Sequence, residues 1–278
     1  MRAAVVQMNS TAEVARNLEI AERLVRAAAG HGAELVVLPE KWNLLAPGPE
    51  LRAGAEPLDG RSISAARAWV TELGLVLVAG SFAERGEGER VFNTSVLIDA
   101  EGELVATYRK IHMFDVDVGG VSYRESENEE AGEEVVVAEA GGLEIGMSVC
   151  YDVRFPELYR ILAVRGARAF TIPSAFTLHT GRDHWEVLLR ARAIENQAFV
   201  VAADQFGQAP PHYDSYGRSM IVDPWGVVLA VAPDGEGLAT AELDLDGQEG
   251  VRRALPSLAN RRPQAYRWPD LVEATERG

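Results

Sequence analysis

The sequence predicts a single α/β domain in which helices cover a core of two β-sheets. In the first third of the chain, buried strand patterns alternate with amphipathic helix patterns, which is typical of parallel crossovers. Hairpin patterns follow in the middle, so the sheets are expected to be mixed. No internal repeat, low-complexity segment or interdomain linker interrupts the 278 residues. We therefore expect one domain over residues 1–278, with about 247–278 as a C-terminal extension.

The first third opens with a strand at 2–8 and a helix that begins at a capping box, Ser10-x-x-Glu13. Gly30 and Gly32 are expected to end this helix. The elements that follow are a buried strand at 34–38 that ends in Pro39-Glu40, a loop rich in proline and glycine, a helix at about 62–73 and a strand at 75–79. The strands of this part of the chain are the ones that we expect to be parallel.

The middle of the chain begins with a hairpin at 91–98 and 103–108, and Lys110 comes just after it. The acidic run Glu125–Glu134 is interpreted as a polar loop. The later expected elements are strands at 135–138 and 143–149, a helix from Pro156 with the apolar stripe Leu158, Ile161, Leu162 and Val164, a strand at 168–172, a helix at about 183–196, a strand at 199–203, a hairpin at 219–222 and 227–230, and a strand at 239–243.

The formal net charge of −15 argues against nucleic acid and anionic membranes as partners. No apolar run approaches the roughly 20 residues of a membrane span. The N-terminus carries no signal-peptide pattern, and one cysteine excludes an intrachain disulfide. Together these features predict a cytoplasmic protein.

Cys150, the only cysteine, lies where the predicted strand 143–149 gives way to the helix from Pro156. Backbone N–H groups are unpaired at such a turn and can face an oxyanion, so the thiol is well placed to be a nucleophile. The alternative is a small core side chain, because free cysteine is among the most buried residue types.

Glu40 and Lys110 also follow strand ends, and with Cys150 they form a sufficient set for acyl transfer through a thioester. A carboxylate in a dry pocket has a raised pKa and can take the thiol proton. An ammonium is expected to lower the thiol pKa and to stabilise the oxyanion. Spacing alone leaves open the alternative that Glu40 and Lys110 form surface salt bridges.

The chain resembles the nitrilase, or carbon–nitrogen hydrolase, superfamily over nearly its whole length. The motifs are Leu38-Pro39-Glu40, Tyr108-Arg-Lys-Ile-His112, Cys150-Tyr-Asp-Val-Arg-Phe-Pro-Glu157, Gly181-x-x-His-Trp-Glu186, Arg190-Ala-Arg-Ala-Ile-Glu-Asn196 and Asp223-Pro-Trp-Gly226. The resemblance implies an α-β-β-α sandwich, with Glu40 as base, Lys110 as oxyanion stabiliser and Cys150 as nucleophile. It also implies a homodimer, or a higher homo-oligomer, and no metal or organic cofactor.

Further site residues follow from the same resemblance. Tyr123-Arg-Glu125-Ser is similar to a stretch of the Nit-type amidases whose glutamate is a second active-site carboxylate, and solvent exposure in the acidic run is the alternative for Glu125. The backbone N–H of Tyr151 is expected in the oxyanion site.

The expected substrate-binding residues are Arg154, Ser174, Phe176 and Thr177. Arg154 would pair with a substrate carboxylate, as in related carbamoylases, or form an ion pair with Asp152 or Glu157. His184 and Trp185 are expected to fix the loop before their helix, and two pairs at helical spacing, Glu186 with Arg190 and Arg192 with Glu195, to be structural.

The implied function is a cysteine-dependent amidohydrolase that releases ammonia from a small carboxylated amide, such as deaminated glutathione or a related keto-acid amide. An omega-amidase acting on α-ketoglutaramate or succinamate, and an N-carbamoyl amino acid hydrolase, are the alternatives. A different class is a catalytically silent interaction protein on the same fold, or an acyltransferase. An inactive relative should have lost one of Glu40, Lys110 or Cys150, and all three are present.

Overall fold

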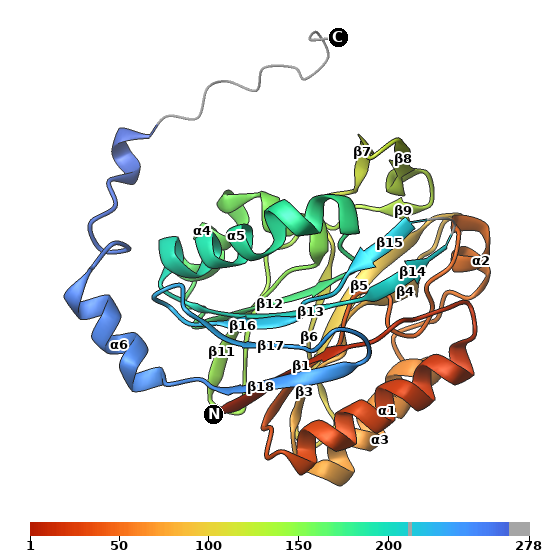
Figure 1. Cartoon of the computed structure of the whole chain (residues 1–278), viewed down its shortest axis with the longest axis horizontal. Coiled ribbons are helices and arrows are strands. Elements are labelled where there is room, and N and C mark those ends of the chain that lie inside the picture. The colour runs from red at the N-terminus through yellow and green to blue at the C-terminus, as the bar shows by residue number, and fades with distance from the viewer. Residues whose placement is uncertain (211–212, 267–278) are drawn as a thin grey trace, which may run out of the picture.

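Two β-sheets lie face to face between two layers of helices in the computed structural model, which describes residues 1–210 and 213–266 (Figure 1). Helices α1 (Val14–Gly30) and α3 (Arg61–Leu73) cover the first sheet. Helices α4 (Pro156–Val164) and α5 (Leu178–Asn196) cover the second sheet. The predicted α-β-β-α sandwich is therefore confirmed.

The first sheet has the strand order β18-β1-β2-β3-β5-β4, with β6 and β9 also paired to β5. Its strands are β1 (Arg2–Gln7), β2 (Leu35–Val37), β3 (Val76–Val78), β4 (Phe82–Arg85), β5 (Val91–Ile98), β6 (Leu104–Arg109), β9 (Glu129–Glu130) and β18 (Gly237–Glu242). Successive side chains point to opposite faces of a strand. Ala3 and Val5 therefore join the core between the sheets, and Ala4 and Val6 join the core beneath the helices.

The second sheet has the order β10-β11-β12-β13-β16-β17. Its strands are β10 (Val137–Ala140), β11 (Leu143–Met147), β12 (Ala169–Ser174), β13 (Phe199–Asp204), β16 (Met220–Val222) and β17 (Val228–Val231). The pairs β11–β12 and β12–β13 are parallel, so the carboxyl ends of these three strands lie at the same edge of the sheet. Two small hairpins stand apart from both sheets: β7 (Asp115–Val118) with β8 (Val121–Arg124), and β14 (Phe206–Ala209) with β15 (Tyr213–Tyr216).

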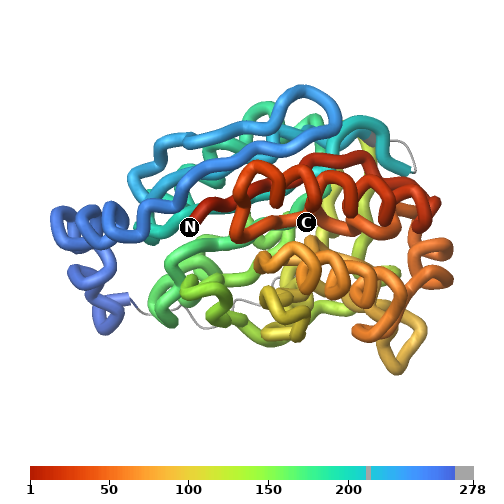
Figure 2. The backbone as a smooth tube through the Cα atoms, turned by 90° about the horizontal axis from the view of Figure 1, so that it is seen from below, coloured from red at the N-terminus to blue at the C-terminus, as the bar shows by residue number. Residues whose placement is uncertain are grey.

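Helix α6 (Leu245–Ala254) projects from one end of the sandwich, as Figure 2 shows from below. The remaining elements are a short helix α2 (Gly48–Ala53) and three 3-10 turns, η1 (Glu125–Glu127), η2 (Cys150–Arg154) and η3 (Pro263–Ala265). The expected C-terminal extension thus begins within α6, and its residues 267–278 lie outside the described part. No helix in the described part is long and apolar enough to cross a membrane.

Several local expectations were wrong. Ser10 does not cap α1, because its hydroxyl donates to the carbonyl of Trp42. Ile161 and Val164 lie on the exposed side of α4, which buries Leu158, Tyr159, Leu162 and Ala163 instead. Helix α5 begins at Leu178 rather than at about residue 183, so no loop directly precedes His184 and Trp185 for them to fix.

The acidic run 125–134 is not a simple polar loop. It contains η1 and the two-residue strand β9, which pairs in parallel with β5. The Glu129 side chain is only 3% exposed and that of Glu125 only 9%. The sequence pattern also missed α2, β4 and both small hairpins.

Candidate active site

Glu40, Lys110 and Cys150 meet at one cavity of about 350 Å³. Glu40 follows β2, Lys110 comes directly after β6, and Cys150 begins η2 after β11. The cavity wall also includes Glu125, Tyr151, Arg154, Phe176 and Thr177. The structure therefore brings these predicted site residues together from both sheets.

Ser174 is the exception among the predicted site residues. It is fully buried at the end of β12, and its hydroxyl donates to the carbonyl of Ile172 at 3.4 Å. Its own carbonyl accepts from the backbone N–H groups of Glu40 and Gln205. The cavity wall is formed by the next residue, Ala175. Ser174 therefore ties the two sheets together rather than facing a substrate.

The Glu40 carboxylate is held on both oxygens. Oε1 accepts from Lys110 Nζ at 3.0 Å and from Asn93 Nδ2 at 2.8 Å. Oε2 accepts from the backbone N–H of Ala175 at 2.9 Å. Glu40 is 3% exposed, so these donors replace water around it. A carboxylate fixed in this way presents one defined geometry to the neighbouring thiol.

Lys110 bridges two carboxylates. Its Nζ lies 2.7 and 2.9 Å from the two oxygens of Glu125, in addition to its contact with Glu40. Burial disfavours the ammonium, but Glu125 and Glu40 outweigh it and raise the pKa of Lys110 well above its usual value. Lys110 is therefore a cation at neutral pH.

Glu125 stays ionised despite its burial. Burial favours the neutral acid, but Lys110 and then Lys41 lower its pKa to about 2. The backbone N–H of Phe114 donates to Oε2 at 2.8 Å and stabilises the same charge. The solvent-exposed alternative for Glu125 does not hold, since its carboxylate faces the cavity cations.

Cys150 has a backbone φ of +49°, in the left-handed region that is costly for a residue with a Cβ. Burial, followed by the charge of Glu40, raises the pKa of the thiol well above its usual value, against the opposing effect of Lys110. Lys110 lowers the thiol pKa, as expected, but burial and the charge of Glu40 outweigh its effect. The resting sulfur carries its proton and depends on a base at the moment of attack.

Asp152 fixes the turn that holds Cys150. Its fully buried carboxylate accepts from the backbone N–H of Val149 at 2.8 Å and from the Tyr108 hydroxyl at 2.7 Å. The other oxygen lies 3.2 Å from the backbone N and 2.7 Å from Nδ1 of His112. This clamp joins η2 to β6 and to the segment just after it. In the sequence, only the spacing Cys-x-Asp could have indicated that Asp152 supports the turn at Cys150.

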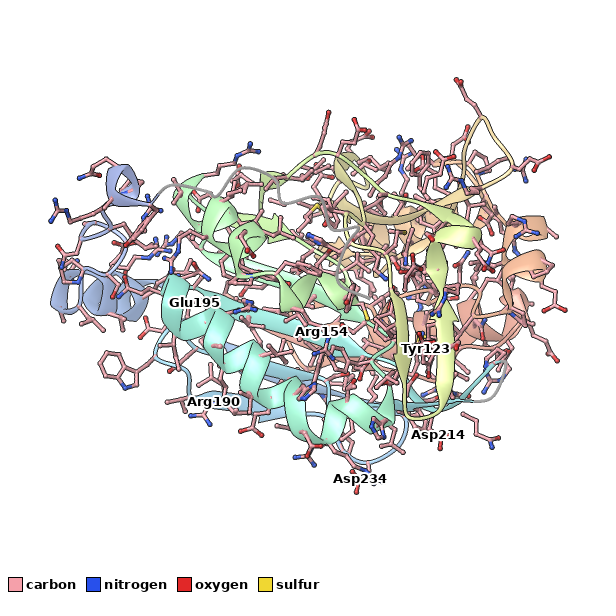
Figure 3. The ribbon with its side chains drawn as sticks, turned by 90° about the horizontal axis from the view of Figure 1, so that it is seen from above. Tyr123, Arg154, Arg190, Glu195, Asp214 and Asp234 are labelled. Carbon is pink, nitrogen blue, oxygen red and sulfur yellow. The ribbon has the colours of Figure 1, made fainter. Side chains whose placement is uncertain are left out.

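Arg154 lies in the cavity wall, and one of its guanidinium N–H groups contacts another side chain. Its Nη1 is 3.1 Å from Nδ1 of His184, and its guanidinium carbon is 5.0 Å from the ring centre of Phe176. No ion pair joins it to Asp152 or Glu157 within the described residues. Figure 3 labels Arg154 together with Tyr123 of the β7–β8 hairpin, and both line the cavity. A guanidinium in this position can take a carboxylate.

Three further polar residues reach the site without having been predicted from the sequence. Asn93 of β5 donates to Glu40, and Lys41 pairs with Glu129 in the cavity wall. Of these three residues, only Lys41 carried a signal in the sequence, namely its position directly after Glu40. Across residues 1–210 and 213–266, no group of three or more His, Cys, Asp or Glu side chains could hold a metal ion.

The chain is similar to characterised amidases. A family model described as carbon-nitrogen hydrolase matches residues 2–253. Deaminated glutathione amidase of Homo sapiens is 44% identical over 272 residues, which cover 95% of this chain and 83% of that protein. Omega-amidase NIT2 of Danio rerio is 36% identical over 266 residues, or 95% of this chain and 96% of that protein.

Solved structures agree with these relatives. The NitFhit protein of C. elegans superposes with a TM-score of 0.90 at 37% identity, covering 96% of this chain and 66% of that one. Nit3 of Saccharomyces cerevisiae, a nitrilase superfamily member, gives a TM-score of 0.86 at 31% identity, covering 96% and 97%.

A variant of the amidase from Nesterenkonia sp. AN1, with acrylamide added to its active-site cysteine, gives a TM-score of 0.81 at 27% identity, covering 95% and 98%. This chain belongs to the carbon–nitrogen hydrolase family and is a hydrolase that acts on amides.

Proposed function

We propose that this enzyme hydrolyses a small carboxylated amide of the deaminated-glutathione type through a thioester on Cys150. The observation that carries the proposal is the meeting of Glu40, Lys110 and Cys150 in one cavity whose wall also holds the Arg154 guanidinium. A volume of about 350 Å³ suits a small ligand. The higher identity to deaminated glutathione amidase of Homo sapiens, 44%, than to omega-amidase NIT2 of Danio rerio, 36%, favours that substrate.

The first half of the mechanism forms the acyl-enzyme. Glu40 takes the Cys150 proton while sulfur attacks the amide carbon, since the thiol is protonated at rest. Lys110 and the backbone N–H of Tyr151 hold the oxyanion. Proton transfer to Glu40 removes the charge that holds one Lys110 donor at 3.0 Å. That donor is then free to turn toward the oxyanion.

The second half releases the products. Glu40 returns its proton to the departing nitrogen, which leaves as ammonia from a primary amide and as an amine from a substituted one. Glu40 then takes a proton from water, whose oxygen attacks the thioester carbon. The carbon–sulfur bond breaks, the carboxylic acid leaves, and Glu40 passes that proton to the Cys150 sulfur, which restores the resting thiol. Glu125 keeps its charge throughout and holds Lys110 in place.

The test is to measure the release of acid and of ammonia or amine from deaminated glutathione, α-ketoglutaramate, succinamate and an N-carbamoyl amino acid, with Cys150→Ala as the matched control. Fastest turnover of deaminated glutathione is expected, and no turnover by Cys150→Ala. Preference for the two smaller amides would favour an omega-amidase instead, and preference for N-carbamoyl amino acids would favour a carbamoylase. Equal turnover by Cys150→Ala rejects the nucleophile, and no turnover by the parent favours a silent interaction protein.

We propose also that the enzyme is a homodimer that packs through α4 and α5. Both helices expose apolar side chains, namely Ile161, Val164, Val187 and Ile194. An exposed apolar surface of this kind marks interaction sites. Light scattering after gel filtration should give a dimer for the parent and a monomer for Val187→Asp. A monomeric parent would reject the proposal.

A cytoplasmic location and a single domain with a C-terminal extension complete the proposal. The lone cysteine supports a reducing compartment. The match to the family over residues 2–253 supports one catalytic domain. Cell fractionation tests the location, and a chain truncated after residue 254 should keep its activity.

A further inference from the structure

A second buried ion pair lies in the cavity wall beside the proposed catalytic residues. Lys41 Nζ is 2.5 Å from Oε1 of Glu129, and the two side chains are 14% and 3% exposed. Both residues line the cavity. Burying two charges costs about as much as their attraction returns, so such a pair is weak evidence for a role in stability. Its position suggests a role in the site.

Lys41 is connected to the proposed catalytic residues through Glu125. Its Nζ lies 3.5 Å from Oε1 of Glu125, the same oxygen that accepts from Lys110 at 2.9 Å. Lys41 also follows Glu40 directly and has a φ of +53°, a conformation that is costly for a lysine. Local strain of this kind persists where the surrounding contacts impose it.

We propose that Lys41 and Glu129 are positioning residues: Glu129 holds the Lys41 ammonium against Glu125, which keeps Glu125 charged and in place to hold Lys110. Glu125 thus lies between two ammonium groups, and each limits how far it can move. The pair acts through Glu125 and Lys110, not on the reacting atoms. This inference rests on the proposed roles of Lys110 and Glu125 in amide hydrolysis.

The charges around Glu129 make the arrangement sensitive to pH. Glu129 faces Lys41, Glu125 and Lys110, and its Oε2 has no hydrogen-bond partner within the described residues. Burial, together with repulsion from Glu125, raises its pKa to about 7 against the attraction of Lys41. Ionisation of Glu129 near neutral pH therefore adds one negative charge to the cavity wall.

The test compares Lys41→Met, Glu129→Gln and the double variant over the pH range of activity, with the amide that the parent hydrolyses fastest. Removing the cation raises the pKa of the carboxylates beside it by about one unit or more. Lys41→Met should therefore lower kcat with little change in KM and move the acid limb of the kcat profile to higher pH. Glu129→Gln should remove the titration near neutrality.

At pH values above the raised pKa of Glu129, the double variant should be more active than Lys41→Met, because only the single variant then holds a buried carboxylate without its cation. The matched control is Glu84→Gln, a carboxylate 4% exposed that pairs with Arg109 outside the cavity lining. It should lose stability without moving the pH profile.

An unmoved acid limb in folded Lys41→Met, or a double variant no more active than the single one at those pH values, overturns the inference. Turnover by Cys150→Ala would reject the proposed function instead.

Discussion

Replacing Asp152 by alanine should both destabilise the protein and disable the thiol. The change leaves the backbone N–H of Val149 and the hydroxyl of Tyr108 fully buried without an acceptor. Each buried unpaired donor costs about 1–3 kcal/mol, so the two together cost about 2–6 kcal/mol. His112 is partly exposed, so water can replace its contact at lower cost.

The kcat of the variant should fall even in the fraction of molecules that stays folded. Cys150 is held at a φ of +49° two residues before Asp152, and loss of the clamp lets the turn relax toward a common conformation. Misplacing a reacting group by about 1 Å can cost about 100-fold in rate. We therefore expect kcat of folded Asp152→Ala to fall by about that factor.

Urea unfolding measures the first effect and single-turnover kinetics the second. The control is Asp223→Ala, which also removes two backbone hydrogen bonds, from Trp225 and Val227, but in a surface turn. Water replaces those contacts, so its loss should stay below about 1 kcal/mol. An Asp152→Ala protein as stable and as active as the control would refute the reasoning.

Three further predictions concern the same cavity. A Cβ on Gly80, whose φ is +45°, would lie 2.0 Å from the carbonyl oxygen of Pro39, so Gly80→Ala should lower both Tm and kcat by displacing Glu40. In Glu40→Gln the thiolate absorbance should appear at lower pH, because the charge that raises the pKa of Cys150 is gone; the chain has no other cysteine to obscure this titration. Arg154→Lys should raise KM for a carboxylated amide and leave KM for an uncharged amide unchanged, since a lysine cannot bind a carboxylate in bidentate fashion.

The strands and their chemistry-bearing ends could be predicted because the signal is local. Alternating apolar residues predicted β11, an apolar run predicted β2, and Glu40, Lys110 and Cys150 were found as polar groups just beyond strand patterns. The convergence of these three residues in one cavity required the resemblance to a family, because no spacing along the chain determines which strand ends meet.

The features that could not be predicted depend on partners distant in the sequence. Glu125 and Glu129 lie in an acidic run typical of solvated loops, and only the ammonium groups of Lys41 and Lys110 make their burial possible. Ile161 and Val164 are apolar but exposed, because α4 turns its other side to the second sheet. Helical periodicity cannot distinguish a core-facing stripe from a second apolar side.

The raised thiol pKa and the buried ammonium are consistent with one another in the proposed mechanism. A thiolate formed before substrate arrives would add a negative charge beside Glu40 in a largely buried site, and burial makes that costly. When attack and proton transfer occur together, Glu40 becomes neutral as the oxyanion becomes charged. The negative charge then only moves from one neighbour of Lys110 to another, and the net charge of the cavity does not change. Preorganised sites stabilise a transition state in this way, because the surrounding dipoles need not reorganise.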